Sequence, residues 1–255
     1  MTQPKVLVYD IETSPSLGWT WQKWDTHILE LQQDWFVLCF AYRWLGDSRT
    51  HVVAQPDFEA DYKKDRTDDR AVVKALWDLF NEADVVVAHN GDRFDQTKMR
   101  ARFLLHGLDP PAPFREVDTL KIARKQFNFI SNSLDDLCRQ LGLGRKAYDG
   151  GFNTWLSCMA GDATSWARMK KYCKHDVVLL EKLYLRLIPW AEQHPNMALI
   201  ADRPDACPKC GKSDGFVSHG WRYYQVTKRR SFRCKSCGGF TYGRSMEKSQ
   251  VTKVS

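Results

Sequence analysis

Four carboxylates and one phenol stand in the chain at spacings that can bring them to one place. Asp10 and Glu12 are two residues apart at the end of an apolar run, and a strand puts such side chains on one face. Tyr172 and Asp176 are four apart, which puts them on one face of a helix. Asp95 follows another apolar run that ends in a turn. Oxygen ligands of this kind suit Mg²⁺ or Mn²⁺, and two such ions can activate water and stabilise the leaving oxygen in phosphodiester hydrolysis.

Each of these pairs also has an ordinary structural explanation. Asp10 and Glu12 could be solvated acids at a strand end, and Tyr172 could be a packed aromatic beside the leucines of its helix. We favour a metal site because three separate segments contribute acids, and because burying Asp176 on the face of Tyr172 would be costly without a cation. Binding of Mg²⁺ or Mn²⁺ is therefore expected to stabilise the protein.

Apolar patterns predict the elements that carry these residues. Short runs rich in β-branched and aromatic residues predict strands, and apolar residues three and four apart predict helices. The predicted strands are 5–10, 35–44, 50–54, 84–89 and 115–118, and the predicted helices are 68–81, 94–106, 119–125, 133–141 and 163–190. This order indicates an α/β fold in which helices flank a mixed sheet.

The acidic segments occur in the order of three known motifs. Asp10-Ile11-Glu12-Thr13, Asn90 to Phe94-Asp95, and Tyr172-x-x-x-Asp176 resemble those of the DnaQ-like, or DEDD, 3′–5′ exonuclease superfamily. The resemblance covers about residues 4–190 and includes phage-encoded members, which have pieces similar to Ser133–Leu137. The chain resembles the tyrosine subgroup, because the other subgroup has a histidine where Tyr172 stands. The resemblance implies a ribonuclease-H-like fold.

The resemblance also implies a role for each acidic residue. Asp10 would bridge two Mg²⁺ or Mn²⁺ ions. Glu12 and Asp176 would bind the ion that holds the attacking water, and Asp95 would act mainly through water on the other ion. Tyr172 is expected to orient the attacking water rather than to take its proton, because the ordinary pKa of a phenol is near 10.

The second motif supplies candidates for substrate contacts. Asn90 and Phe94 match positions that touch the terminal nucleotide in the resembling family, although Asn90-Gly91 is also an ordinary turn. Asp118 is a nearby acid that opens a helix-like segment, so an N-cap is as good an explanation for it as a site role.

An aromatic segment follows the first motif and contains Trp19, Trp21 and Trp24. These side chains could stack on a base of the substrate. Packing is the favoured interpretation, because aromatic side chains bury a large area wherever they lie.

Four of the eight cysteines form two C-x-x-C pairs near the C-terminus. Cys207 and Cys210 are separated from Cys234 and Cys237 by 23 residues, and a glycine follows each pair. This spacing predicts one structural Zn²⁺ in a ribbon similar to those of phage and transposase proteins, since four thiolates leave no open position for catalysis. Chelation is expected to unfold the ribbon. The remaining cysteines are predicted to be buried thiols.

The positive charge of the chain is concentrated in this C-terminal part. The net charge is +7, yet residues 201–255 hold 12 basic and 4 acidic residues, whereas residues 1–200 hold 26 and 27. Basic residues interleaved with aromatic ones are typical of modules that bind nucleic acid. The candidate contacts are Arg222, Lys228, Arg229 and Arg230. The alternative is a basic ribbon that docks a protein partner.

These patterns predict an organisation into four parts. They are an exonuclease-like domain at 1–192, a linker at 193–205, the zinc ribbon at 206–244 and a flexible tail at 245–255. No apolar run is long enough to cross a bilayer, and the first residues lack the pattern of a signal peptide. We therefore expect no membrane partner and a cytoplasmic location, which is the host cytoplasm if the protein is phage-encoded.

The expected function is that of a metal-dependent 3′–5′ exonuclease that hydrolyses single-stranded DNA to nucleoside 5′-monophosphates. DNA is favoured over RNA, and the direction of digestion is implied by the resemblance alone. One alternative is a ribonuclease or structure-specific nuclease with the same site. Another is a non-catalytic accessory protein that binds nucleic acid, although the complete set of carboxylates argues against it. A proofreading role would need a protein partner from replication or recombination.

Overall fold

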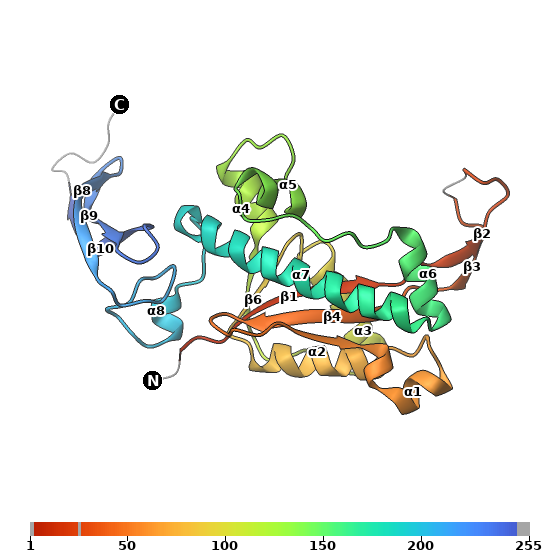
Figure 1. Ribbon diagram of the computed structural model, residues 1–255. Helices are drawn as coiled ribbons and strands as arrows, with labels where there is room; N and C mark the ends of the chain where they lie inside the picture. Colours follow the sequence, from red (N-terminus) through yellow and green to blue (C-terminus); the bar gives the residue numbers. More distant parts are fainter. Residues whose placement is uncertain (1–2, 25–26, 249–255) are drawn as a thin grey trace.

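The computed structural model describes residues 3–24 and 27–248, and a sheet of five strands forms its centre (Figure 1). In sheet order the strands are β5 (His51–Ala54), β4 (Val37–Trp44), β1 (Val6–Thr13), β6 (Val85–Ala88) and β7 (Arg115–Asp118). Strand β1 is antiparallel to β4 and parallel to β6, and β6 is parallel to β7. The expected mixed sheet is therefore confirmed.

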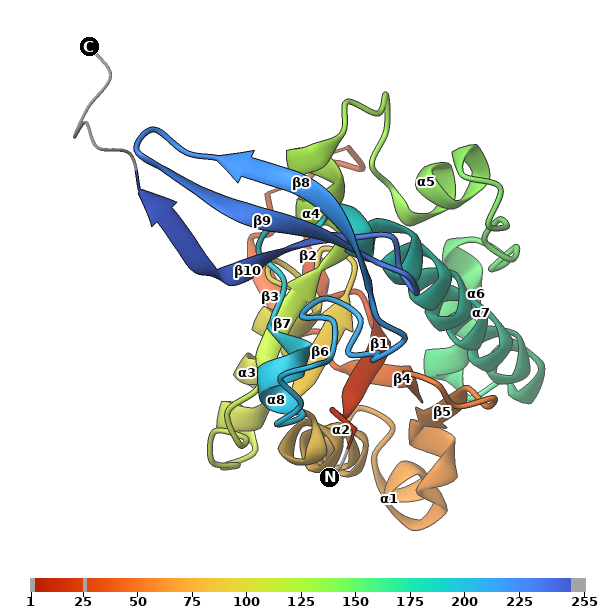
Figure 2. The same cartoon turned by 90° about the vertical axis from the view of Figure 1, so that its left-hand side faces the viewer.

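Helices cover both faces of this sheet (Figures 1 and 2). Helices α2 (Arg70–Glu82) and α3 (Asp95–Leu105) lie on one face, and the long helix α7 (Ala163–Leu187) lies on the other. Around α7 lie α4 (Thr119–Gln126), α5 (Leu134–Gln140) and α6 (Phe152–Ala160). Two short helices, α1 (Glu59–Lys64) and a 3₁₀ turn at Gln55–Asp57, precede α2, and a second 3₁₀ turn at Ile188–Trp190 ends α7. The patterns predicted five of these helices but neither α1 nor α6.

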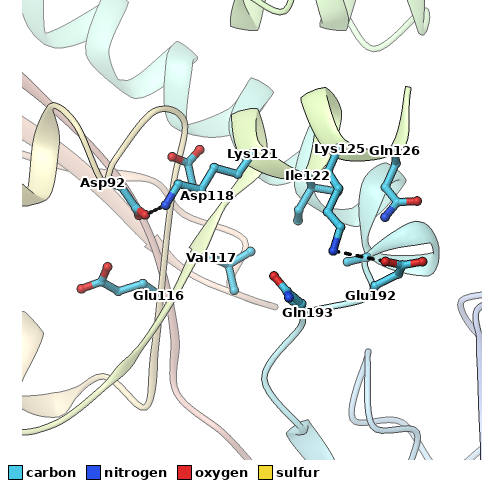
Figure 3. A pocket seen from close by; sticks show the side chains of 11 residues that line it. Asp92, Glu116, Val117, Asp118, Lys121, Ile122, Lys125, Gln126, Glu192 and Gln193 are labelled. Atoms are coloured by element: carbon cyan, nitrogen blue, oxygen red, sulfur yellow. Dashed lines mark hydrogen bonds and ion pairs between the residues drawn. The ribbon is translucent and has the colours of Figure 1, made fainter. Parts of the chain in front are cut away.

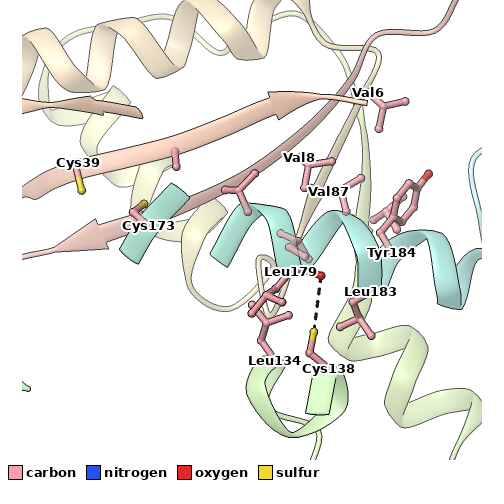
Figure 4. Packing of buried hydrophobic residues seen from close by; sticks show 14 of the residues in the cluster. Val6, Val8, Cys39, Val87, Leu134, Cys138, Cys173, Leu179, Leu183 and Tyr184 are labelled. Atoms are coloured by element: carbon pink, nitrogen blue, oxygen red, sulfur yellow. Dashed lines mark hydrogen bonds between the residues drawn. The ribbon is translucent and has the colours of Figure 1, made fainter. Parts of the chain in front are cut away.

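The alternation of side chains along β1 decides which layer each residue meets. Leu7, Tyr9 and Ile11 pack with α2 and α3, whereas Val6 and Val8 pack with α7 (Figure 4). Asp10 and Glu12 continue the series of Val6 and Val8, so their side chains lie on the α7 side of the sheet. The hydrophobic layer under α7 therefore ends in two acids.

The four cysteines outside the C-x-x-C pairs are buried, as predicted. Cys39 on β4 and Cys173 on α7 lie in the layer between the sheet and the helix (Figure 4). Cys138 lies against the other side of α7, where its thiol donates to the carbonyl oxygen of Leu179 at 3.7 Å. These thiols fill the core on both sides of α7.

A hairpin that the sequence patterns did not predict projects beyond the end of the sheet (Figure 1). It consists of β2 (Leu17–Trp19) and β3 (Glu30–Gln33), which pair antiparallel. Trp19, Trp21 and Trp24 are 62%, 85% and 86% exposed. The expectation that these tryptophans pack in the interior is therefore wrong, because the hairpin leaves the body of the protein before the first of them.

The C-terminal part forms a second sheet in the order β10-β9-β8 (Figure 2). Its strands β8 (Phe216–Tyr223), β9 (Thr227–Cys234) and β10 (Phe240–Lys248) are antiparallel. The expected linker at 193–205 instead contains helix α8 (Met197–Ile200), and Met197 is buried in the main hydrophobic core. The expected tail also begins later than 245, because residues 246–248 pair with β9. Residues 249–255 lie outside the described residues.

Within the described ranges, no helix is long and apolar enough to cross a membrane.

Candidate functional site

Strand β1 presents the first two acids of the cluster. Asp10 and Glu12 are half-buried, and a register shift between Glu12 and Thr13 marks the place where regular pairing with β4 ends. Helix α7 lies directly over this strand. The Cys173 thiol of α7 donates to the carbonyl oxygen of Asp10 at 3.7 Å. The ligand atoms of Asp10, Glu12 and Cys173 all lie within 4.8 Å of one another.

Asp95 joins these acids from the opposite layer of the fold. It is the first residue of α3 and is 2% exposed. Its Oδ1 accepts a hydrogen bond of 3.2 Å from the backbone N–H of Ile11, the residue between Asp10 and Glu12. The parallel pairing of β1 with β6, which leads into α3, thus brings the first two acidic segments together.

Asp176 and Tyr172 come from α7, one helical turn apart. Asp176 is 1% exposed, and its Oδ1 has no hydrogen-bond partner. Tyr172 is buried and packs edge-on against Trp155 of α6, with 6.3 Å between the ring centroids. Both polar groups contact Lys146, whose Nζ donates to Asp176 Oδ2 at 2.6 Å and to the Tyr172 hydroxyl at 2.9 Å.

Burial and mutual repulsion both oppose ionisation of the acids in this cluster. Burial raises the pKa of Asp10 well above its ordinary value, and the carboxylates of Asp95 and Glu12 raise it further. Burial together with the Asp176 carboxylate raises the pKa of Glu12 to about 8. Burial raises the pKa of Asp95 to about 7, although hydrogen bonds from backbone N–H groups oppose this.

This donor set fits divalent cations. Four carboxylates from three segments converge, and one buried carboxylate oxygen of Asp176 has no partner. Mg²⁺ and Mn²⁺ prefer carboxylate oxygens, and a bound cation would offset both the burial and the mutual repulsion that raise these pKa values. Asp10, Glu12, Asp95 and Asp176 are the residues that could hold such ions.

The turn of the second motif lies beside this cluster. Asn90 has a φ of 66°, in the left-handed region that asparagine tolerates, and a side chain on Gly91 would collide with Ala88. Asp118 Oδ1 accepts 2.9 Å hydrogen bonds from the backbone N–H groups of both Asn90 and Leu120. Asp118 therefore caps α4 and fixes the turn at once.

The other predicted contact of the second motif, Phe94, is 39% exposed. The ammonium group of Lys98 lies 5.0 Å from the centroid of its ring and 3.8 Å from that of Trp35. Phe94 thus offers an accessible ring next to a cation. Lys98 and Lys146 were not singled out by the sequence patterns, because neither belongs to a motif.

A pocket of about 220 Å³ adjoins this turn (Figure 3). Asp118 lines it, and its lysines are paired with acids: Lys121 with Asp92, and Lys125 with Glu192 at 3.2 Å. None of the four converging carboxylates lines it. The pocket is therefore a neighbour of the acidic cluster and not a part of it.

The four paired cysteines meet at the base of the C-terminal sheet. All four Sγ atoms lie within 4.8 Å of one another, and the pairs Cys207–Cys237 and Cys210–Cys234 are each 3.9 Å apart. A tetrahedral Zn²⁺ with Zn–S bonds of about 2.3 Å needs Sγ atoms roughly 3.8 Å apart. Each pair is closed by a glycine with positive φ, Gly211 and Gly238, so the geometry is compatible with a zinc ribbon.

The four predicted basic contacts of this sheet lie on both of its faces. Lys228 and Arg230 stack on Trp221, with 4.4 and 4.2 Å between the charged group and the ring centroid. Arg222 stacks instead on Tyr242 at 4.6 Å. Arg229 donates to the sulfur of Met246, which pairs with it on β10. Alternation along the strands therefore divides the four cations into two sets.

Comparison with known proteins adds one match. The sequence model of a family described as the RNase_H superfamily matches residues 32–188, which is more than half of the chain. The matched segment contains β4 through α7 and therefore Asp95, Tyr172 and Asp176, whereas Asp10 and Glu12 precede it. No curated protein matches the chain.

Proposed function

The chain belongs to the RNase H superfamily, and from that premise we propose that it is a 3′–5′ exonuclease that uses two divalent metal ions. The superfamily indicates a metal-dependent nuclease that binds nucleic acid. The finer proposal adds the direction of digestion, single-stranded DNA as the preferred substrate and nucleoside 5′-monophosphates as the product. It also assigns the chain to the tyrosine subgroup of the DnaQ-like enzymes.

The observation that carries the proposal is the convergence of the four carboxylates with Tyr172. Asp95 is hydrogen-bonded to the strand that bears Asp10 and Glu12, and Asp176 has a buried oxygen without a partner. Structural acids in a core are normally paired or hydrogen-bonded. An acidic cluster left short of positive charge on an accessible edge supports a metal-dependent function.

Divalent ions held by Asp10, Glu12, Asp95 and Asp176 would supply an activated water and would neutralise the charge that develops during phosphodiester hydrolysis. The protein's own part is positioning. Burial and the neighbouring Asp176 carboxylate raise the pKa of Tyr172, so its phenol stays protonated and can donate a hydrogen bond. Phe94 and the Asn90 turn would receive the terminal nucleotide.

The C-terminal sheet has a separate part in this proposal. Its four cysteines hold one structural Zn²⁺, and its stacked cations and aromatic side chains bind the nucleic acid away from the cut. Cations beside aromatic rings favour backbone contacts with base stacking, which gives salt-sensitive binding with little sequence preference. Helix α8 and the buried Met197 attach this sheet to the main domain.

The test is digestion of 5′-labelled single-stranded DNA and RNA of one sequence, with Mg²⁺, Mn²⁺ or EDTA. We expect a metal-dependent ladder that shortens from the 3′ end, with DNA cut faster, and no ladder from Asp10→Asn. Asp47→Asn removes an exposed carboxylate from the turn after β4 and is the matched control. Faster cutting of RNA would favour the ribonuclease alternative. If the protein binds both DNA and RNA but cuts neither with Mg²⁺ or Mn²⁺, the proposal that it is a nuclease is refuted.

A further inference from the structure

Lys146 places a positive charge inside the acidic cluster. Its Nζ contacts Asp176 and Tyr172 at once, and the ammonium group lies 5.1 Å from the centroid of the Tyr172 ring. The side chain is 34% exposed, whereas Asp176 is almost fully buried. The lysine therefore reaches from the surface into the cluster.

Two elements hold Lys146 in this position. Its backbone N–H donates to Asp135 Oδ1 of α5 at 2.7 Å, and the carbonyl oxygen of Arg145 accepts from His175 Nε2 of α7 at 2.7 Å. Gly144 has a φ of 134°, and a side chain there would collide with Leu179 of α7. These contacts hold the loop between α5 and α6 against α7, with Lys146 beside Tyr172 and Asp176.

The first consequence concerns Asp176. Lys146 occupies Oδ2, and Oδ1 is the buried oxygen without a partner. A carboxylate held at one oxygen by a fixed donor cannot rotate freely, so it presents the other oxygen in a defined direction. Asp176 is therefore left with one oxygen for a cation.

The second consequence concerns Tyr172. An ammonium group has donors only, so in the contact with Lys146 the phenol oxygen accepts. The hydrogen of the phenol must then point away from Lys146. This arrangement makes Tyr172 a donor toward the cluster and not an acceptor.

We propose that Lys146 is a positioning residue that fixes the free oxygen of Asp176 and the donor direction of Tyr172. It also serves as the resident cation that partly balances the carboxylates when divalent ions are absent. This inference rests on the proposed function for its kinetic part, whereas its electrostatic part concerns the folded protein alone.

The kinetic test compares Lys146→Met, Lys146→Arg and Tyr172→Phe with the double variant Lys146→Met/Tyr172→Phe. Loss of a residue that orients metal ligands lowers activity by about 10–100-fold. We expect a loss of this size in kcat for Lys146→Met, with KM changed less than about threefold, and partial rescue by arginine. The double variant should be little worse than Lys146→Met alone, because loss of Lys146 already removes the orientation of the hydroxyl that Tyr172→Phe deletes. Additive losses, or a KM effect alone, would overturn the positioning role.

The second test needs no activity and compares melting temperatures at pH 8 in EDTA and in excess Mn²⁺. Lys146→Met should melt below the wild type in EDTA and should gain more from Mn²⁺. Lys182→Met is the matched control, because Lys182 of α7 donates to the carbonyl oxygen of Leu143 in the same loop and, among the described residues, forms no hydrogen bond or ion pair with an acid of the cluster. Equal behaviour of the two variants would overturn the resident-cation role. If the wild type cuts nothing, the proposed function fails, yet this comparison still decides the part played by Lys146.

Discussion

Removal of divalent ions should make the stability of this protein fall as the pH rises through neutrality. Asp95 and Glu12 have pKa values of about 7 and about 8, against ordinary values of 3.8 and 4.5. Between the ordinary and the raised values, the folded state binds more protons than the unfolded state, so stability decreases with increasing pH. The window therefore runs from about pH 4 to about pH 8. Bound cations remove this dependence, because they stabilise the ionised carboxylates.

The size of the effect follows from the pKa differences. One pKa unit corresponds to about 1.4 kcal/mol, so between pH 5.5 and 8 Asp95 loses roughly 2 kcal/mol and Glu12 roughly 3 kcal/mol. Relaxation of the cluster and water entry reduce these figures, and a loss of at least about 2 kcal/mol in total is expected. That is a large fraction of the stability of an ordinary domain.

The assay is urea unfolding in EDTA and in excess Mn²⁺ at pH 5.5 and 8. The free energy of unfolding should fall with pH in EDTA and stay nearly level in Mn²⁺. Asp95→Asn keeps an acceptor for the N–H of Ile11 but does not titrate, so it should lose part of the slope in EDTA. A stability that is level or rises with pH in EDTA would refute the reasoning.

Three further predictions concern the C-terminal sheet and the β2–β3 hairpin. Cys234→Ser should unfold the C-terminal sheet and leave the main domain intact, which limited proteolysis will show as a stable fragment ending near residue 206. Trp21→Ala and Trp24→Ala should change the stability by less than about 0.5 kcal/mol but weaken binding of single-stranded oligonucleotides by about 1 kcal/mol or more, measured by fluorescence anisotropy. Unchanged affinity would exclude base stacking by the hairpin. Lys228→Ala and Arg230→Ala should each reduce the slope of log K against log salt by about 0.7 on single strands, and an unchanged slope would point to a protein partner for this sheet.

The arrangement of the acids could be predicted because it depends on short-range periodicity. A spacing of two on β1 and of four on α7 fixes the faces of Asp10, Glu12 and Asp176 before any tertiary contact is known. The buried run of β6 likewise predicts a strand that is followed by Asp95, and the structure adds that this strand is parallel to β1. Fold class follows from the same patterns.

Other features depend on contacts between distant segments, which the patterns do not contain. Lys146 acquires its place only when α5 and α7 close on its loop, and no spacing in the sequence marks it. Tryptophan is a residue type that is usually buried, yet the tryptophans of the hairpin are exposed to solvent. Their exposure depends on whether another segment packs against the hairpin, which the sequence pattern does not contain. Prolines between 189 and 208 suggested a loose connection, yet Met197 has enough apolar contact with the main core to order that stretch.

The base of the β2–β3 hairpin is held by two hydrogen bonds close to Glu12. Ser14 is buried, its backbone N–H donates to the carbonyl oxygen of Phe36 at 2.8 Å, and its hydroxyl accepts from the N–H of Phe36 at 2.9 Å. These two hydrogen bonds join the two ends of the hairpin at Ser14, two residues after Glu12. Strands β2 and β3 therefore start from a fixed point beside the acids, and a displacement at this end of the hairpin reaches Glu12 only by breaking these two hydrogen bonds.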